Sequence, residues 1–189
     1  MTDHETSRGF TLPEILITIG MISIVLSLAV PSVNSMLKDN QLVVHLNNVV
    51  ADIHFARSEA AKRDVRVIMC RSNSTGAPVP TCGGSNYNWS GGYIIFADDG
   101  NYSNNVYDSG TDTLLRVVQP SQSKVKMRTN TNWNNTLEFN SNGSSNESGI
   151  AIMSFCDDRG TESGKQIQVN TNGIPKLFSG NISDCAPDP

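Results

Sequence analysis

The first feature of this chain is an absence: no Lys, Arg, Asp or Glu occurs between Glu14 and Lys38. At about 1.5 Å per residue, the segment 10–37 is long enough to cross a bilayer core of about 30 Å. Glu14 stands near its start, where an ionised carboxylate is costly and is usually retained for a partner. These observations predict a helix that lies in lipid or in the packed middle of a helical assembly.

The chain also lacks the residue patterns of catalytic and cofactor sites. It has no Ser/His/Asp or Cys/His arrangement for nucleophilic catalysis, and no glycine-rich loop joins a strand to a helix as phosphate binding needs. Its aspartate-rich loop around 98–112 does not follow the order of an EF-hand. The formal net charge is -4, so nucleic-acid binding would need a local basic patch. We therefore expect no enzyme, no metal site and no other cofactor.

Three interpretations of the N-terminus compete. A secretory signal peptide would have a basic leader and a small-residue cleavage site after its apolar core, whereas here acidic residues outnumber Arg8 and Gly9 precedes the apolar run. A plain membrane anchor fits the length of the run but leaves Glu14 unexplained. A leader cut after Gly9 creates a new amine on Phe10, close to Glu14, so that the amine and carboxylate of neighbouring subunits neutralise each other.

The run Gly9-Phe10-Thr11-Leu12-Pro13-Glu14, followed by an apolar helix, resembles the class III signal of type IV pilins and type II secretion pseudopilins. The resemblance implies that a prepilin peptidase cuts between Gly9 and Phe10 and methylates the new N-terminus. It also implies that Glu14, then the fifth residue, guides docking of each subunit into the growing fibre. The chain would divide into a leader at 1–9, a transmembrane and fibre-core helix at 10–37, and a periplasmic head domain at 38–189.

Four cysteines beyond the apolar segment indicate two disulfides in an oxidising compartment: Cys70, Cys82, Cys156 and Cys185. They form no Cys-x-x-Cys pair and have no nearby histidine, which argues against zinc or thioredoxin-like chemistry. Sequence alone allows three pairings. We favour Cys70 with Cys82, because a Gly/Pro-rich loop follows the strand that ends at Cys70. Cys156 would then pin the C-terminal tail through Cys185.

The hydrophobic pattern predicts one long helix followed by strands. Pro31 should bend the helix without ending it, because apolar residues continue beyond it at steps of four and three: Leu42, Leu46, Val49, Ile53, Ala56 and Ala60. The period then changes to two in eight runs: 65–70, 93–96, 113–118, 125–127, 136–139, 150–156, 165–169 and 174–178. Asn172-Gly173 predicts a hairpin turn between the last two. The predicted class is α+β: a long N-terminal helix, half transmembrane and half amphipathic, packed on an antiparallel β-sheet head.

Three segments of the head are similar to the GspH/FimT group of minor pilins and pseudopilins: Phe55–Cys70, Asn88–Gly100 and Phe155–Gly160. In that group, GspH serves type II secretion, FimT-like members serve type IV pili, and some members bind DNA during natural transformation. The segment FCDDRG and the tail closed by Cys185 are closer to FimT. The resemblance implies a FimT-like minor pilin that acts in pilus assembly or initiation, with a GspH-like minor pseudopilin of a type II secretion system as the alternative.

The same resemblance implies partners and a location. The partners would be other major and minor pilins, met through the N-terminal helix, together with the prepilin peptidase and the inner membrane. The chain would cross the bacterial inner membrane once, with its head in the periplasm, and would later enter the pilus fibre or its tip.

DNA-binding members of the group carry a Gly-Arg-x-Arg motif on the last hairpin, where this chain has Gly173-Ile174-Pro175-Lys176. Lysine meets a phosphate as a point charge but lacks the bidentate fork of arginine. The candidates for binding double-stranded DNA are Arg159, Lys165 and Lys176, expected near that hairpin, and Lys124, Lys126 and Arg128, expected on one face of a strand. A solvated polar face is the preferred account of both groups, since isolated basic residues on an acidic domain are common. DNA binding is therefore the secondary hypothesis.

Overall fold

The computed structural model describes residues 9–84, 87–100, 105–121, 124–133, 135–179, 182 and 185. All of the expected leader except Gly9 lies outside these residues. The chain forms two compact units, Met1–Lys38 and Asp39–Pro189, and we call the second the head unit. Helix α1 spans Leu12–Arg63 and passes through Pro31 without ending.

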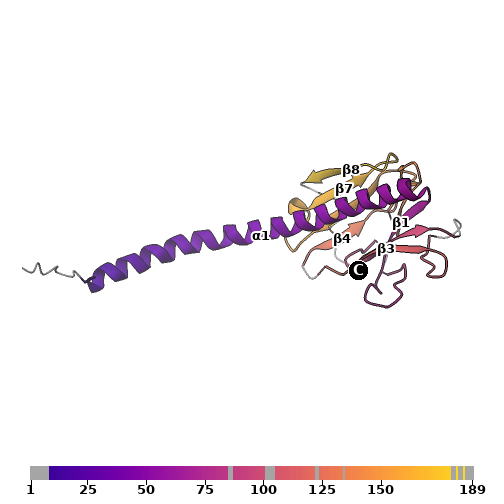
Figure 1. Cartoon of the computed structure of the whole chain (residues 1–189). Coiled ribbons are helices and arrows are strands. Elements are labelled where there is room, and N and C mark those ends of the chain that lie inside the picture. The colour runs from indigo at the N-terminus through magenta and orange to yellow at the C-terminus, as the bar shows by residue number, and fades with distance from the viewer. Residues whose placement is uncertain are drawn as a thin grey trace, which may run out of the picture. The chain divides into compact units, whose positions relative to one another are not determined.

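The head unit contains eight antiparallel strands in the described part of the chain (Figure 1). Sheet A has the order β3-β2-β1-β5 and sheet B the order β4-β6-β7-β8. The bounds are β1 Arg66–Arg71, β2 Tyr93–Asp98, β3 Thr113–Val118, β4 Lys126–Thr129, β5 Thr136–Phe139, β6 Ala151–Cys156, β7 Lys165–Val169 and β8 Pro175–Ser179, with a short 3-10 helix η1 at Thr161–Ser163. The α+β class and the antiparallel pairing are confirmed, but the strands divide between two sheets where the sequence had predicted one.

The C-terminal half of α1 packs its apolar face against both sheets. The predicted stripe is buried along its length, and the exposed fraction of its side chains is at most 4%: Leu42, Leu46, Val49, Ile53, Ala56 and Ala60. It meets Val67 and Met69 of sheet A and Met153 and Phe155 of sheet B in one core. The helix ends at Arg63, and the next residue, Asp64, has a φ of 56°, the left-handed conformation that commonly terminates helices.

Sheet A is covered on both faces. Ile68, Cys70, Ile94 and Phe96 point away from α1, because side chains alternate across a strand, and they form a second apolar cluster. Cys82 packs against this cluster. The disulfide between Cys70 and Cys82 therefore fastens the β1–β2 loop to the second cluster.

Sheet B buries one face against α1. The registers place the alternate residues on the opposite side, which we call the outer face of sheet B: Lys126 and Arg128 of β4, Ile152, Ser154 and Cys156 of β6, Gln166 and Gln168 of β7, and Lys176 and Phe178 of β8. None of the four strands contains Asp or Glu. Basic and amide side chains thus share this face with apolar ones.

Candidate functional site

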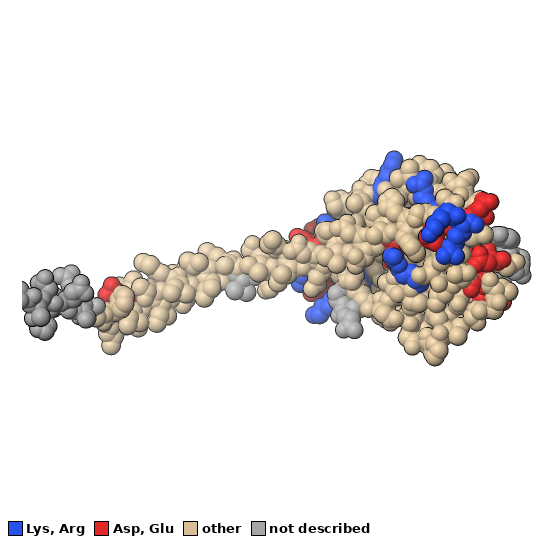
Figure 2. Space-filling model, in the orientation of Figure 1, with Lys and Arg blue, Asp and Glu red and all other residues tan. Residues whose placement is uncertain are grey.

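The N-terminal half of α1 exposes apolar side chains. Exposed fractions range from 47% at Ile15 to 80% at Phe10 among the large hydrophobic residues before Lys38. One helix in the described part of the chain is long and apolar enough to cross a membrane, with a mean hydropathy of 2.3 over 18 residues. Figure 2 shows this half of α1 almost without charged side chains, apart from an acidic spot near its start. This surface suits lipid or other helices, because burying apolar area is favourable.

Hydroxyl groups on this half of α1 are satisfied within the helix. Thr18 Oγ1 donates to the Ile15 carbonyl at 2.8 Å, and Ser23 Oγ donates to the Ile19 carbonyl at 2.8 Å. Ser27 bonds similarly to Ile24. Such back-bonding removes the need for water around a polar side chain. The segment can therefore enter an apolar medium without leaving these hydroxyls unpaired.

Glu14 lies in the first turn of α1, two residues after the helix begins. The backbone N–H of Thr11 donates to Glu14 Oε2 at 3.5 Å. Thr11-Leu12-Pro13-Glu14 has the spacing of a capping box, in which the glutamate reaches back to the residue before the helix. A carboxylate at this end also suits the positive end of the helix dipole. The fold thus holds the Glu14 carboxylate beside the backbone N–H of Thr11.

The cysteines pair as the sequence favoured. Cys70 is bonded to Cys82 and Cys156 to Cys185, with Cα–Cα distances of 5.6 and 5.7 Å. The second bond joins the end of β6 to the tail that follows β8. Ile182 of that tail is buried, and its N–H donates to the Thr161 carbonyl at 3.2 Å. Ile182 and Cys185, the two described residues after β8, are therefore held at the η1 end of sheet B.

The basic residues expected near the last hairpin are not brought together. Lys165 lies opposite Phe155 and Ser179 in the strand register, so its side chain is on the face of sheet B that packs on α1. Lys176 lies opposite Gln168, on the outer face. Arg159 follows β6 at the end of the sheet opposite to the β7–β8 turn. The expectation of a cluster was wrong because antiparallel register and side-chain alternation separate the three residues.

Arg159 is also engaged by carboxylates. Its Nη2 lies 2.6 Å from Asp157 Oδ2 and 2.9 Å from Asp39 Oδ1. The hydrogen bonds that Arg159 donates to Asp157, and then to Asp39, raise the pKa of Arg159 above its ordinary value. Arg159 therefore ties the β6–η1 corner to α1, which leaves little of its charge for a ligand.

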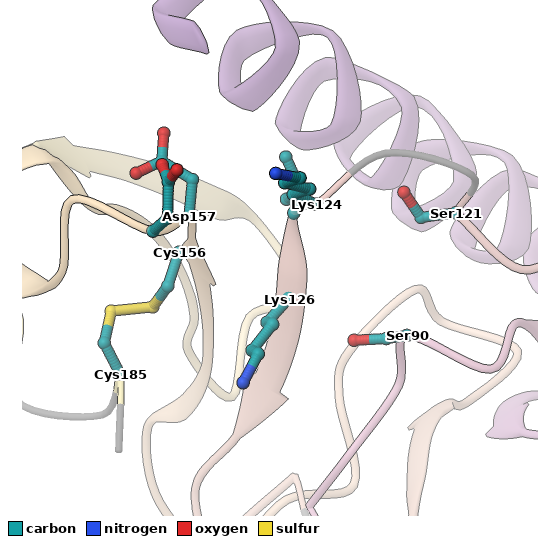
Figure 3. Close-up of a pocket in the computed structure, with 9 residues that line it drawn as sticks. Ser90, Ser121, Lys124, Lys126, Cys156, Asp157 and Cys185 are labelled. Atoms are coloured by element: carbon teal, nitrogen blue, oxygen red, sulfur yellow. A yellow bond between two sulfur atoms is a disulfide. The ribbon is translucent and has the colours of Figure 1, made fainter. Parts of the chain in front are cut away.

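The second basic group keeps part of its expected arrangement. Lys126 and Arg128 share the outer face of sheet B, while Lys124 precedes β4. Ser90, Ser121, Lys124, Val125, Lys126, Cys156, Asp157, Asp158 and Cys185 line a pocket of about 520 Å³. Figure 3 shows the Cys156–Cys185 bond on one side of this pocket, Ser90 and Ser121 on the other, and Lys126 of β4 between them. The charges of two lysines and two aspartates in the pocket lining cancel, so the pocket has no net positive charge that would attract an anion.

A polar network that sequence analysis missed lies between α1 and sheet A. Tyr93 Oη donates to Asp52 Oδ2 at 2.6 Å, and Arg116 forms an ion pair with the same carboxylate. The Arg116 guanidinium stands 4.2 Å from the centre of the Phe55 ring. Burial, followed by the Asp52 charge, raises the pKa of Tyr93 well above its ordinary value. No local sequence signal marks these contacts, since each of them joins residues at least 41 positions apart.

A second missed network joins β1, β2 and β5. Arg66 forms ion pairs with Asp98 and Glu138, and Asn146 Nδ2 donates to Glu138 Oε2 at 3.1 Å. Burial and the Glu138 charge raise the pKa of Glu147 to about 7. The ion pair with Arg66 gives Asp98 a structural role in joining β1 to β2. No cluster of three or more potential metal ligands occurs among the described residues.

Three aromatic residues of the head unit, Trp89, Trp133 and Tyr93, lie in its core. Trp89 and Trp133 are fully buried, and Tyr93 is 1% exposed. The centre of the Trp89 ring lies 5.8 Å from the ring centres of both Tyr93 and Trp133. These residues therefore stabilise the head and offer no stacking surface.

Comparison with known proteins finds one matching family and solved structures with a similar fold. A family model described as "Type II transport protein GspH" matches residues 45–173. Crystal structures of the type IV minor pilin FimU from Pseudomonas aeruginosa (strain PAO1) match in two crystal forms. The first has 16% sequence identity and a TM-score of 0.56, covering 74% of this chain and 89% of the FimU chain. The second has 16% identity and a TM-score of 0.50, covering 70% and 88%. No curated protein matches.

Proposed function

The chain belongs to the GspH family and has the pilin fold, and from this premise we propose that it is a FimT-like minor pilin that acts in assembly or initiation of a type IV pilus. The alternative within the same family is a GspH-like minor pseudopilin of a type II secretion system. Both are structural subunits that assemble with other pilins. The family alone does not separate these two machines.

The observation that carries the proposal is the exposed apolar half of α1 with Glu14 in its first turn. Large hydrophobic side chains there are 47–80% exposed, and the segment carries no other charge before Lys38. Apolar area of this extent is stable in lipid or among other helices, and not in water. Membrane anchoring before assembly and helix packing afterwards use the same surface.

The mechanism that we propose begins with cleavage between Gly9 and Phe10 by a prepilin peptidase, followed by methylation of Phe10. The new amine would carry a positive charge at the start of an apolar helix, where an unpaired charge is costly. Glu14 of one subunit would offset the amine of its neighbour. Before assembly the chain would cross the inner membrane once, with the head unit in the periplasm.

A deletion experiment tests the pilus role against the secretion role. We expect a strain without this chain to lose most of its surface pili, measured by shearing and immunoblotting for the major pilin, while export of secreted enzymes stays unchanged. Plasmid-borne chain should restore the pili, which controls for effects on neighbouring genes. Loss of enzyme export with normal pili would overturn the pilus proposal and favour the pseudopilin.

DNA binding is a second candidate, favoured by the acid-free strands of sheet B. Lys126, Arg128 and Lys176 share its outer face, and no carboxylate occurs in the four strands. Three inter-strand spacings of about 4.8 Å place β4 and β8 about 14 Å apart. The three cations are therefore spread along a face and would meet separate phosphates of double-stranded DNA during natural transformation.

Salt dependence tests this candidate on the oxidised head unit. Three phosphate contacts predict a slope of log K against log salt of about -3, and Lys176→Ala should reduce its magnitude by about 1. Lys62→Ala is the matched control, since Lys62 is exposed at the end of α1. Absence of DNA retention at low salt, or equal effects of the two variants, would refute a DNA role for the outer face.

A further inference from the structure

A second pocket, with a volume of about 620 Å³, lies between α1 and the β5–β6 loop, and we call it the Arg57 pocket. Its lining residues come from α1 and from the loop: Ala51, His54, Phe55, Arg57, Ser58, Ala61, Asn142 and Gly143. The lining contains Arg57 but no Asp or Glu, so the pocket carries net positive charge. The pocket beside Cys156 differs in this respect, because its lysines and aspartates cancel.

The backbone holds the Arg57 guanidinium in place. Arg57 Nε donates to the Gly143 carbonyl at 2.8 Å, and the side chain is half-buried. An arginine side chain has five N–H donors, so the donors on Nη1 and Nη2 remain. Among the described residues, no hydrogen-bond acceptor meets these two nitrogens. Arg57 therefore offers an oriented pair of donors that matches the two oxygen atoms of a carboxylate.

Arg57 also lacks the carboxylate partner that other arginines of the head unit have. Those arginines form ion pairs: Arg63 with Glu59, Arg66 with Asp98 and Glu138, Arg116 with Asp52, and Arg159 with Asp39 and Asp157. No carboxylate in the described part of the chain forms an ion pair with Arg57. Removing a cation from water without an opposite charge is costly. A carboxylate supplied by a partner would offset that cost.

We propose that the Arg57 pocket docks an acidic side chain from the head of a neighbouring pilin subunit, an inference that rests on the proposed pilin function. The carboxylate accepts hydrogen bonds from Arg57 Nη1 and Nη2, and the apolar part of the side chain packs on Ala51 and Ala61, which are both exposed. One cation beside small apolar residues suits one carboxylate of a protein. Nucleic acid or an anionic bilayer would need several cations together, because their phosphates are many.

Site-specific photocrosslinking of the full chain in assembled pili tests the proposal. A benzophenone amino acid replaces Ser58, which is exposed and lines the pocket, and mass spectrometry maps its adducts. We expect adducts with another pilin, beside an Asp or Glu of its head. Adducts with lipid or nucleic acid, or only with pilin segments that lack Asp and Glu, would overturn the proposal.

A second crosslinking position separates this inference from the proposed function. Ile22 lies in the N-terminal half of α1 with 57% of its side chain exposed, so it should form adducts with other pilins if this half packs among their helices. Adducts from Ile22 but none from Ser58 would refute docking at the Arg57 pocket alone. Absence of pilin adducts from both positions would refute the assembly role, and docking with it.

A charge variant tests the part played by Arg57 without removing it. Ala61 is exposed and lies four residues after Arg57, and residues four apart are neighbours on a helix. Ala61→Glu therefore supplies an internal carboxylate that competes for the guanidinium, and it should reduce the Ser58 adduct roughly fivefold. Ala61→Gln is the matched control, because it has the same shape without the charge and should keep the adduct.

The Ile22 adduct and tryptophan fluorescence should stay unchanged in both variants, which would show that assembly and the core around Trp89 and Trp133 are intact. Equal reduction of the Ser58 adduct by the two variants would assign the effect to shape and refute the charge interaction. An undiminished Ser58 adduct in the Ala61→Glu protein would also refute it.

Discussion

Replacing Glu14 with alanine is expected to leave the head unit folded but to prevent incorporation of the chain into the fibre. The proposed contact joins the Glu14 carboxylate to the Phe10 amine of a neighbouring subunit, within packed helices. Removing one partner of a buried ion pair costs about 3–5 kcal/mol, which corresponds to roughly 100- to 4,000-fold weaker association at about 1.4 kcal/mol per tenfold change. The measurement compares the amount of the variant in sheared pili with its amount in the membrane fraction.

Two further variants separate the charge from other effects of the substitution. Glu14→Gln keeps the shape of the side chain and its capacity to accept the Thr11 hydrogen bond, so failure of this variant too would assign the effect to the charge. Glu162→Ala removes an exposed carboxylate from η1 in the head unit and should be incorporated normally. Normal incorporation of Glu14→Ala would refute the assembly role that we propose for this residue.

Local features of the fold were predictable because they depend on neighbours in sequence. Leu42 to Ala60 form the buried stripe that their spacing predicted, and α1 continues through Pro31. Each of the eight predicted strands overlaps an observed one. Helical and strand periodicities reflect which face of an element meets the core, so they appear directly in the residue pattern.

The arrangement of strands was not predictable in the same way. β5 pairs with β1 rather than with β4 or β6, its neighbours in sequence, and this choice divides the head into two sheets. Short apolar runs are compatible with several partners, because each needs only an apolar surface on one side. The separation of Lys165 from Lys176 follows from the register of β7 and β8, which the sequence does not display. Which basic residues lie close together could therefore be seen only in the structure.

The β7–β8 turn shows how one predicted local feature depends on an unpredicted distant contact. Asn172-Gly173 forms the expected turn, and the Gly173 N–H donates to the Asn170 carbonyl at 2.8 Å. The turn lies on the β5–β6 loop, where Arg57 Nε of α1 donates to the Gly143 carbonyl at 2.8 Å. A Cβ atom on Gly173 would collide with that same carbonyl oxygen. The absence of a side chain at Gly173 thus permits the β7–β8 turn to approach the β5–β6 loop, which is bonded to α1.

Gly173→Ala is accordingly expected to destabilise the oxidised head unit by about 3 kcal/mol. Gly173 has a φ of 72°, a conformation that costs a residue with a side chain about 1 kcal/mol or more, and relieving the collision with a backbone oxygen adds about 1–3 kcal/mol. Urea unfolding, followed by tryptophan fluorescence, measures the difference in the free energy of unfolding.

Gly160→Ala is the matched control, because Gly160 has a φ of 83° but no atom within 4 Å of the added Cβ. It should cost only the conformational part, about 1–3 kcal/mol, because its ψ of −156° places it in a region that residues with a side chain rarely adopt. Equal losses in the two variants would mean that the close approach of Gly173 to Gly143 contributes nothing. A larger loss at Gly173 would show that the close approach of the last hairpin to the Gly143 carbonyl is part of the native packing.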